Sequence, residues 1–265
     1  MALLDRFFGD SCRLCGVRGV TALGNVFPTH HGVFQTKDFC LRHCRNCDVV
    51  YLDPLPSEAD LRVLYQDTVQ FNEPHYTDPT KVQKILEHYG NSIRTLQLVP
   101  RSGGRVLEIG AGLAWISRAC KDIQSNILAV AQDVSTECAQ ACPWVDHYFV
   151  GALEDLPDYG PYQLVSLTHV IEHLTEPERM LERVSNLLVP NGRAYITAPF
   201  RPSGWTRGRG MEGWLEYSYL HVPAHISYFS RRWFEQRAKL YGMQIVHWDN
   251  THEDGQAFEL VLRKI

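Results

Sequence analysis

The sequence lacks the features that place a chain in a membrane, outside the cell or on nucleic acid. No apolar run approaches the roughly 18 residues that span a bilayer. Residues 1–10 include Asp5 and Asp10 and lack the basic and apolar regions of a secretory signal. The net charge is -4, so the chain as a whole does not attract nucleic acid or anionic lipid. We therefore expect a soluble, cytoplasmic protein whose partner is a small molecule, with no membrane association and no preference for nucleic acid.

Internal repeats and low-complexity tracts are also absent. The chain of 265 residues is long enough for one full-sized α/β core and a small appended unit. We expect a Cys-rich, zinc-binding module over residues 1–56, a helical linker and N-terminal cap over 57–104, and the main domain over 105–265.

Cysteines concentrate near the N-terminus, where five of the 8 lie within the first 47 residues. Four of them form the pairs Cys12-Arg-Leu-Cys15 and Cys44-Arg-Asn-Cys47. Two such pairs can close a tetrahedral zinc site, because a soft divalent cation with four thiolates needs no other ligand. A closed site leaves no open coordination position, so we assign the zinc a structural role and no part in chemistry.

Other interpretations of these cysteines stay open. They could form disulfides, which the cytosolic character of the chain disfavours, or they could be buried thiols without a ligand. Cys40 or His43 could also replace one of the four ligands, since a strand over residues 39–44 would alternate its side chains between two faces. Four cysteines remain the simpler prediction.

From residue 105 the pattern alternates between strands and helices. Apolar, β-branched runs predict strands at 105–109, 127–132, 147–150, 162–168 and 193–198, and helical periodicity predicts helices at 81–98, 113–121, 135–142 and 176–188. Strands separated by helices form parallel βαβ units, so we expect a doubly wound α/β sheet.

The first of these strands ends in a glycine turn. Gly110 and Gly112 leave the backbone N–H groups at the start of the next helix open to a ligand. Position 115, where a dinucleotide-binding motif has its third glycine, holds Trp115, which argues against a pyrophosphate. Glu108 instead offers a carboxylate to a cationic ligand end, and Asp133 after the next strand can take both hydroxyls of a ribose. The alternative is that both carboxylates only cap helices.

These motifs resemble a known family. Residues 106–114, Val-Leu-Glu-Ile-Gly-Ala-Gly-Leu-Ala, resemble the glycine motif of class I S-adenosylmethionine-dependent methyltransferases, and residues 129–135 resemble their acidic second-strand motif. Residues 162–174 and 187–199 are similar to the fourth- and fifth-strand motifs of the ubiquinone-biosynthesis-like subgroup, and residues 225–230 to a segment that opens a late helix. The cysteine pairs and residues 51–54 resemble the zinc module of sugar C-methyltransferases. The resemblance implies a Rossmann-like, mostly parallel seven-stranded sheet.

The same resemblance implies the site residues. It implies contacts to S-adenosyl-L-methionine from Glu108, Gly110, Ala111, Gly112, Asp133, Val134, Ala152, Leu153 and His169. Within this set, Glu108 and the glycines surround the methionine end, Asp133 binds the ribose, and Val134, Ala152 and Leu153 line the adenine.

A base is needed only where the attacking group is a weak acid, such as a phenol, and an imidazole can accept its proton. Our candidates for the base are His225, His173 and His169, with His221 as a further possibility and His225 slightly favoured. Each of them could equally be a hydrogen-bonded loop histidine.

The segment after the strand at 193–198 is rich in aromatic residues, arginines and glycines between residues 200 and 221. It could form a lid over an acceptor, a contact in a homodimer, or a solvated loop. We expect an enzyme that methylates a small molecule, on oxygen, in natural-product or modified-sugar biosynthesis. The alternatives are a C- or N-methyltransferase of a sugar, a protein or RNA methyltransferase, and a non-enzymatic binding scaffold.

Overall fold

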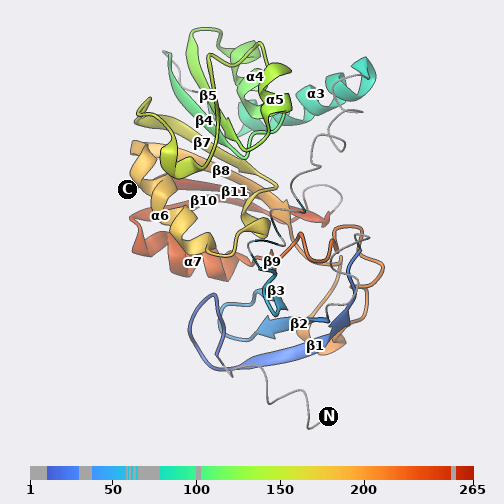
Figure 1. The fold of residues 1–265 in the computed structure, drawn as a ribbon. Coiled ribbons are helices and arrows are strands. Elements are labelled where there is room, and N and C mark those ends of the chain that lie inside the picture. The colour runs from blue at the N-terminus through green and yellow to red at the C-terminus, as the bar shows by residue number, and fades with distance from the viewer. Residues whose placement is uncertain are drawn as a thin grey trace.

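Two β-sheets organise the described part of the chain, shown as a computed structural model in Figure 1. The structure describes residues 11–29, 38–57, 59, 61, 64, 78–99, 103–251 and 255–265. Most of the predicted linker between residues 57 and 77 therefore lies outside the described residues. None of the helices in these ranges combines the length and the hydropathy needed to cross a bilayer.

The larger sheet has the strand order β10-β11-β8-β7-β4-β5-β6. Its central pairs are parallel, and β10 and β11 add an antiparallel edge next to β8. The prediction of a mostly parallel, seven-stranded Rossmann-like sheet is confirmed. The strands are β4 (Gly104–Ile109), β5 (Ile127–Asp133), β6 (His147–Val150), β7 (Tyr162–Thr168), β8 (Leu188–Pro199), β10 (Met243–Asp249) and β11 (Ala257–Lys264).

Helices cover both faces of this sheet. Side chains alternate between the two faces along each strand, so apolar residues on both faces need a covering layer. From β4, Leu107 packs in the core cluster that includes residues of α6 and α7, whereas Val106 packs in the cluster that includes residues of α3 and α4. Figure 1 shows these two helix pairs on opposite sides of the sheet. The helices are α3 (Pro79–Thr95), α4 (Trp115–Ile123), α5 (Thr136–Gln140), α6 (Pro177–Leu187) and α7 (Arg231–Leu240), with short 3-10 helices η2 (Leu153–Asp155), η3 (Ile171–His173) and η4 (Arg207–Arg209).

Helix ends differ from the predictions by a few residues. Helix α3 begins at Pro79 because Asp78 caps it by accepting from the N–H of Thr80 at 2.9 Å, two residues before the predicted start. Helix α5 is shorter than predicted: Ser135 is its cap rather than its first turn, and Pro143 follows Cys142, a position where helices rarely continue.

The smaller sheet contains β1 (Val20–Val26), β2 (Phe39–Cys44), β3 (Val50–Asp53) and β9 (Ser227–Tyr228), all antiparallel. Three strands come from the N-terminal cysteine region, and β9 comes from the segment after β8. Figure 1 shows this sheet at one end of the molecule, with β9 facing the larger sheet. The N-terminal strands are therefore completed by a strand from the far end of the sequence.

The aromatic segment at residues 200–221 packs on this smaller sheet. Trp214 is fully buried, and Trp205 is 6% exposed. Both belong to one core cluster with Phe39 and Leu52 from the strands. Their buried rings are thus part of a core, not the surface of an open lid or of a contact with a second copy.

Candidate active site

The glycine turn joins the carboxyl end of β4 to the start of α4. Gly110 and Gly112 have φ angles of 58° and 47°, in the left-handed region that favours glycine. The N–H of Ala111 donates to the carbonyl of Gln132 at 2.9 Å, which ties the turn to β5. A Cβ atom at Gly110 would lie 2.5 Å from Cγ2 of Val170, so the turn after β7, which carries Val170, lies close to the glycine turn. Because Gly110 has no side chain, the turn after β4 and the turn after β7 can lie this close together.

Glu108 lies beneath this turn, almost fully buried. Its Oε1 and Oε2 atoms accept from the N–H groups of Ile116 and Ser117 at 3.2 and 2.8 Å, at the positive end of α4. Burial raises the pKa of Glu108 to about 7, and the charge of Asp133 adds to the increase. The two carboxylates therefore lie close enough to interact, on the same side of the sheet.

Asp133 closes the other side of the turn. Its Oδ2 accepts from the N–H of Gly112 at 2.8 Å, and its Oδ1 accepts from those of Val134 and Ser135 at 2.7 and 3.0 Å. The structure thus gives both carboxylates a role in capping and shaping the loops, and each retains lone pairs for a further donor. Gln132, which the sequence analysis did not single out, donates to the carbonyl of Gly151 at 2.7 Å and so joins β5 to the loop after β6.

An apolar edge borders Asp133. Val134 is 64% exposed, which is unusual for a valine and leaves a surface on which a flat ring can lie. Ala152 caps η2, which begins at the buried Leu153, and Gly151 donates its N–H to the carbonyl of Asp133 at 2.9 Å. The residues predicted for adenine are therefore neighbours at one edge of the sheet.

His169 stands at the carboxyl end of β7. Its φ angle of 54° is rare for a residue with a side chain and marks a sharply turned backbone. The next residue is Val170, which contacts Gly110, so His169 lies beside the glycine turn. Its side chain is 30% exposed, its Nδ1 lies 3.5 Å from Oε1 of Glu172, and its ring stacks on Tyr219 with centroids 5.9 Å apart.

Glu172, in η3, is a residue that the sequence analysis did not assign to the site. Its side chain is fully buried, and neither oxygen has a hydrogen-bond partner among the described residues. Burial opposes its ionisation, but the imidazoles of His173 and His169 outweigh that effect, and the pKa of Glu172 lies below its ordinary value. The sequence signal that could have identified this residue is a carboxylate between apolar residues, in the segment Val-Ile-Glu-His-Leu.

His173 and His225 complete this cluster. Nε2 of His173 lies 3.7 Å from Oε1 of Glu172, while its Nδ1 lies 2.9 Å from the carbonyl of Ala224. His225 is buried, and its Nδ1 lies 2.7 Å from the carbonyl of Tyr219. Burial lowers the pKa of His225 to about 3, so its ring is neutral near pH 7. Ligand atoms of Glu172, His173 and His225 lie within 4.8 Å of one another, a spacing that could also hold a metal ion.

Comparison with known proteins decides the family. A family model described as "Methyltransferase domain" matches residues 83–248, which include the glycine turn and the histidine cluster. The chain belongs to this family. The predicted resemblance to methyltransferases is thereby confirmed.

The chain is also similar to a curated relative and to solved structures, the latter bearing on the fold alone. A ubiquinone biosynthesis O-methyltransferase of Xylella fastidiosa (strain 9a5c) is 29% identical over 133 residues, which cover 45% of this chain and 52% of that protein. The chain thus spans about half the length of the curated relatives it matches. Magnesium protoporphyrin IX methyltransferase from Synechocystis PCC 6803, solved with bound SAH, aligns with a TM-score of 0.57 at 14% identity over 79% of this chain and all of that one. An S-adenosylmethionine dependent methyltransferase from Mesorhizobium loti aligns with a TM-score of 0.52 at 13% identity, covering 68% of this chain and 100% of that one.

The chain also brings its four predicted zinc ligands together. The Sγ atoms of Cys12 and Cys47 are 3.8 Å apart, those of Cys15 and Cys44 are 3.6 Å apart, and all four lie within 4.8 Å of one another. Thiolates about 2.3 Å from a tetrahedral zinc ion are about 3.8 Å apart, so the spacing fits that ion. The spacing far exceeds a disulfide bond of about 2.05 Å. The hydrogen bond between the two thiols lowers the pKa of Cys12 to about 5 and raises the pKa of Cys47 well above its ordinary value, so the pair shares one proton.

The other candidate ligands near this group have different partners. Cys40 donates to the carbonyl of Leu41 at 3.4 Å, and Nε2 of His43 lies 2.8 Å from Oδ1 of Asp48. The group of four that could hold a metal ion contains neither of them. The candidate donor set is therefore four sulfurs.

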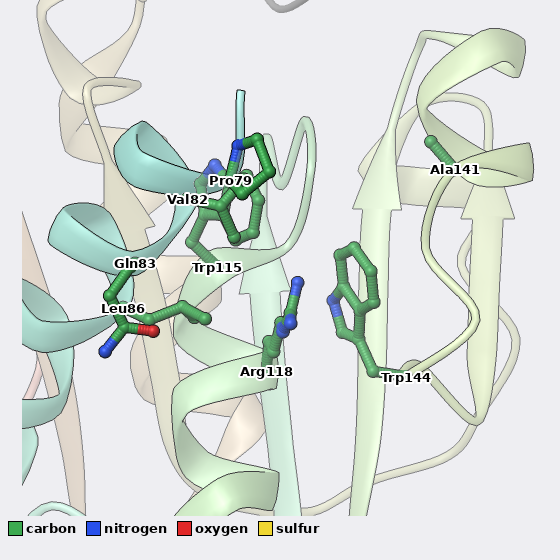
Figure 2. A pocket seen from close by; sticks show the side chains of 8 residues that line it. All are labelled: Pro79, Val82, Gln83, Leu86, Trp115, Arg118, Ala141 and Trp144. Atoms are coloured by element: carbon green, nitrogen blue, oxygen red, sulfur yellow. The ribbon is translucent and has the colours of Figure 1, made fainter. Parts of the chain in front are cut away.

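A separate pocket of about 560 Å³ opens between α3, α4 and the loop before β6 (Figure 2). The guanidinium of Arg118 lies 4.7 Å from the ring centre of Trp144 and 5.8 Å from that of Trp115. The pocket is lined by none of the residues predicted for the cofactor or for catalysis. It is therefore distinct from the candidate active site.

Proposed function

We propose that this methyltransferase transfers a methyl group from S-adenosylmethionine to a hydroxyl oxygen of a small molecule. The observation that carries the proposal is the placement of His169, next to Glu172 and beside the glycine turn of Gly110. A cofactor site and an imidazole with a buried carboxylate behind it thus meet at the ends of two neighbouring parallel strands, where ligands bind in such sheets.

In this proposal the loops after β4, β5 and β6 hold the cofactor. Glu108 faces the ammonium of the methionine end, and Asp133 faces the ribose hydroxyls. Val134 and Leu153 lie against the adenine. S-adenosylmethionine supplies an electrophilic methyl group on a sulfonium. The residues of the chain orient the two reactants and exclude water, which is most of what such a displacement requires.

The histidines favour oxygen as the attacking atom. A hydroxyl must lose its proton as its oxygen forms the new bond to carbon and the bond from carbon to sulfur breaks, whereas a neutral amine can attack without a base. We assign the proton to Nε2 of His169, because the Nδ1 of this ring faces Glu172 and its side chain is partly exposed. His225 is buried and nearly always neutral, so we assign it a place in the wall of the site rather than the role of base.

A hollow of about 420 Å³ lies at the carboxyl end of β8, lined by Phe200, Arg201 and Trp205 among others but by none of the candidate cofactor or base residues. The curated relatives named above are O-methyltransferases, which further supports oxygen. A role in natural-product or modified-sugar biosynthesis belongs to the proposal, as does a structural zinc ion at the four cysteines.

The test has two steps. Calorimetry with S-adenosylhomocysteine measures the cofactor site, and we expect micromolar binding. The protein is then incubated with methyl-labelled S-adenosylmethionine and a panel of phenols, catechols, amines and sugar hydroxyls, and the labelled products are identified by mass spectrometry. Label on a hydroxyl that disappears in His169→Asn supports the proposal. Absence of S-adenosylhomocysteine binding, or label found only on nitrogen or carbon, contradicts it.

A further inference from the structure

We infer that the four-cysteine site positions the wall of the acceptor site, so that a metal bound there holds the buried His225 in place. The inference rests on the proposed function, because it is that proposal which makes the residues around His225 a wall of the acceptor site. It assigns the metal to the acceptor half of the site and not to the cofactor half. Hydrogen bonds connect each cysteine turn to the segment that carries the histidine cluster.

The first cysteine turn, residues 12–15, is bound by the segment after β8. The carbonyl of Leu14 accepts from Nε1 of Trp233 and from the guanidinium of Arg237, both at 3.2 Å. Arg13 in the same turn donates to Oγ of Ser227 at 2.7 Å. A turn whose shape depends on two metal-bound thiolates thus carries contacts to both β9 and α7.

The second cysteine turn, residues 44–47, is bound by the same segment. Oγ of Ser230 donates to the carbonyl of Cys47 at 2.6 Å, and the guanidinium of Arg232 donates to the carbonyl of Asn46 at 3.3 Å. Directly after the turn, Oδ2 of Asp48 accepts from Arg201 at 3.0 Å. Both metal-binding turns are therefore held by residues 201–237.

Two further bonds extend this network to the site. The N–H of Leu52 in β3 donates to the carbonyl of Ile226 at 2.9 Å, and the N–H of Ile226 donates to the carbonyl of Glu172 at 2.8 Å. His225, next to Ile226, lies edge-on to His173 with ring centres 4.8 Å apart. The backbone of residues 224–230 thus runs between the cysteine module and the turn that carries Glu172.

The residues proposed to bind the cofactor have a different set of hydrogen-bond partners. The side-chain hydrogen bonds of Glu108 and Asp133 described above stay within residues 108–135, and the backbone carbonyls of Gly112 and Asp133 accept from Tyr148 and Gly151 near β6. Small units that close around zinc lose their folded shape without the ion, because their few residues bury too little apolar surface. Metal removal is therefore expected to release residues 224–230 while the glycine turn keeps its form.

The experiment measures how well His225 is protected from a reagent for imidazoles. The full-length protein, with its zinc content determined by elemental mass spectrometry, is treated with diethyl pyrocarbonate before and after metal removal by a chelator. Peptide mass spectrometry gives the labelling rate of His225, with the exposed His147 as an internal reference. Calorimetry with S-adenosylhomocysteine is run on the same samples.

We expect labelling of His225 to rise at least tenfold on metal removal, while S-adenosylhomocysteine affinity changes less than threefold. Arg13→Ala keeps all four thiols, so it should keep the metal and still raise the labelling of His225, whereas Arg18→Ala, at an exposed position of the same module, should not. The inference is overturned if the protein takes up no zinc, if labelling stays unchanged after complete removal, or if cofactor affinity is lost in parallel. A metal-loaded protein that fails to bind S-adenosylhomocysteine contradicts the proposed function instead, because the labelling ratio does not depend on that ligand.

Discussion

The Nδ1 atom of His169 lies 3.5 Å from Oε1 of Glu172, a carboxylate that is completely buried and has no hydrogen-bond partner among the described residues. A buried carboxylate of this kind is costly unless nearby positive charge stabilises it. An imidazole that takes up a proton during the reaction supplies such a charge. The pair can thus make a histidine a better proton acceptor than it is in water, which agrees with the direction of the Glu172 pKa.

Replacing Glu172 tests this relationship. Glu172→Gln keeps the size of the side chain and removes its charge, so we expect kcat for a hydroxyl acceptor to fall about 100-fold, the lower end of typical general-base effects. Affinity for S-adenosylhomocysteine should stay within threefold. Steady-state kinetics and calorimetry measure both. Glu176→Gln, at a surface ion pair with Arg179, is the matched control and should behave like the unchanged protein.

A side chain at Gly110 should disrupt the cofactor site. Gly110→Ala combines an unfavourable positive φ angle with a contact of 2.5 Å to Val170, so the turn must shift away from β7. We expect S-adenosylhomocysteine to bind at least tenfold more weakly. Gly208→Ala is the control, since open space surrounds Gly208 and its backbone is unstrained. Equal affinities of the two variants in calorimetry would show that the turn does not contact the ligand.

The raised pKa of Glu108 predicts a pH dependence of cofactor binding. The carboxyl is half ionised near pH 7, and only the ionised form attracts an ammonium group, so affinity should increase as the pH rises from 6 to 8. The same shift means that the folded chain holds this proton more tightly than the unfolded chain, so its contribution to stability falls as the pH rises between about 4.5 and 7. Glu108→Gln should flatten both trends. Calorimetry and thermal unfolding across this range measure them, and a variant with unchanged slopes would assign the titration to another group.

Val134 offers a test of the adenine surface. Its side chain is 64% exposed beside Asp133, and an adenine lying on it would be repelled by a nearby charged, hydrated group. We expect Val134→Asp to weaken S-adenosylhomocysteine binding at least tenfold without lowering the melting temperature. The matched change Val246→Asp places the same charge on an exposed valine of β10 and should leave the affinity unchanged. A loss of similar size in both variants would refute a specific role for Val134.

The placement of the residues proposed to bind the cofactor was largely predictable because its signals are local in sequence. The turn of Gly110 and Gly112 follows a hydrophobic strand directly, and Asp133 ends the next one, so strand order alone brings them to one edge of the sheet. The paired spacing of Cys12 with Cys15 and of Cys44 with Cys47 is equally local. Each pattern needs only a few neighbouring residues, and the structure places these residues as the patterns indicate.

The arrangement of the histidines proposed for the acceptor side was decided by tertiary structure. The sequence names His169, His173 and His225 and slightly favours His225, but burial and partners decide which imidazole can take a proton, and these depend on contacts between distant segments. The importance of Glu172 could not be predicted for the same reason, because it depends on three histidines that tertiary contacts bring around its side chain. That the cysteine turns hold residues 201–237 also follows from contacts across some 200 positions of the chain, which no local periodicity records.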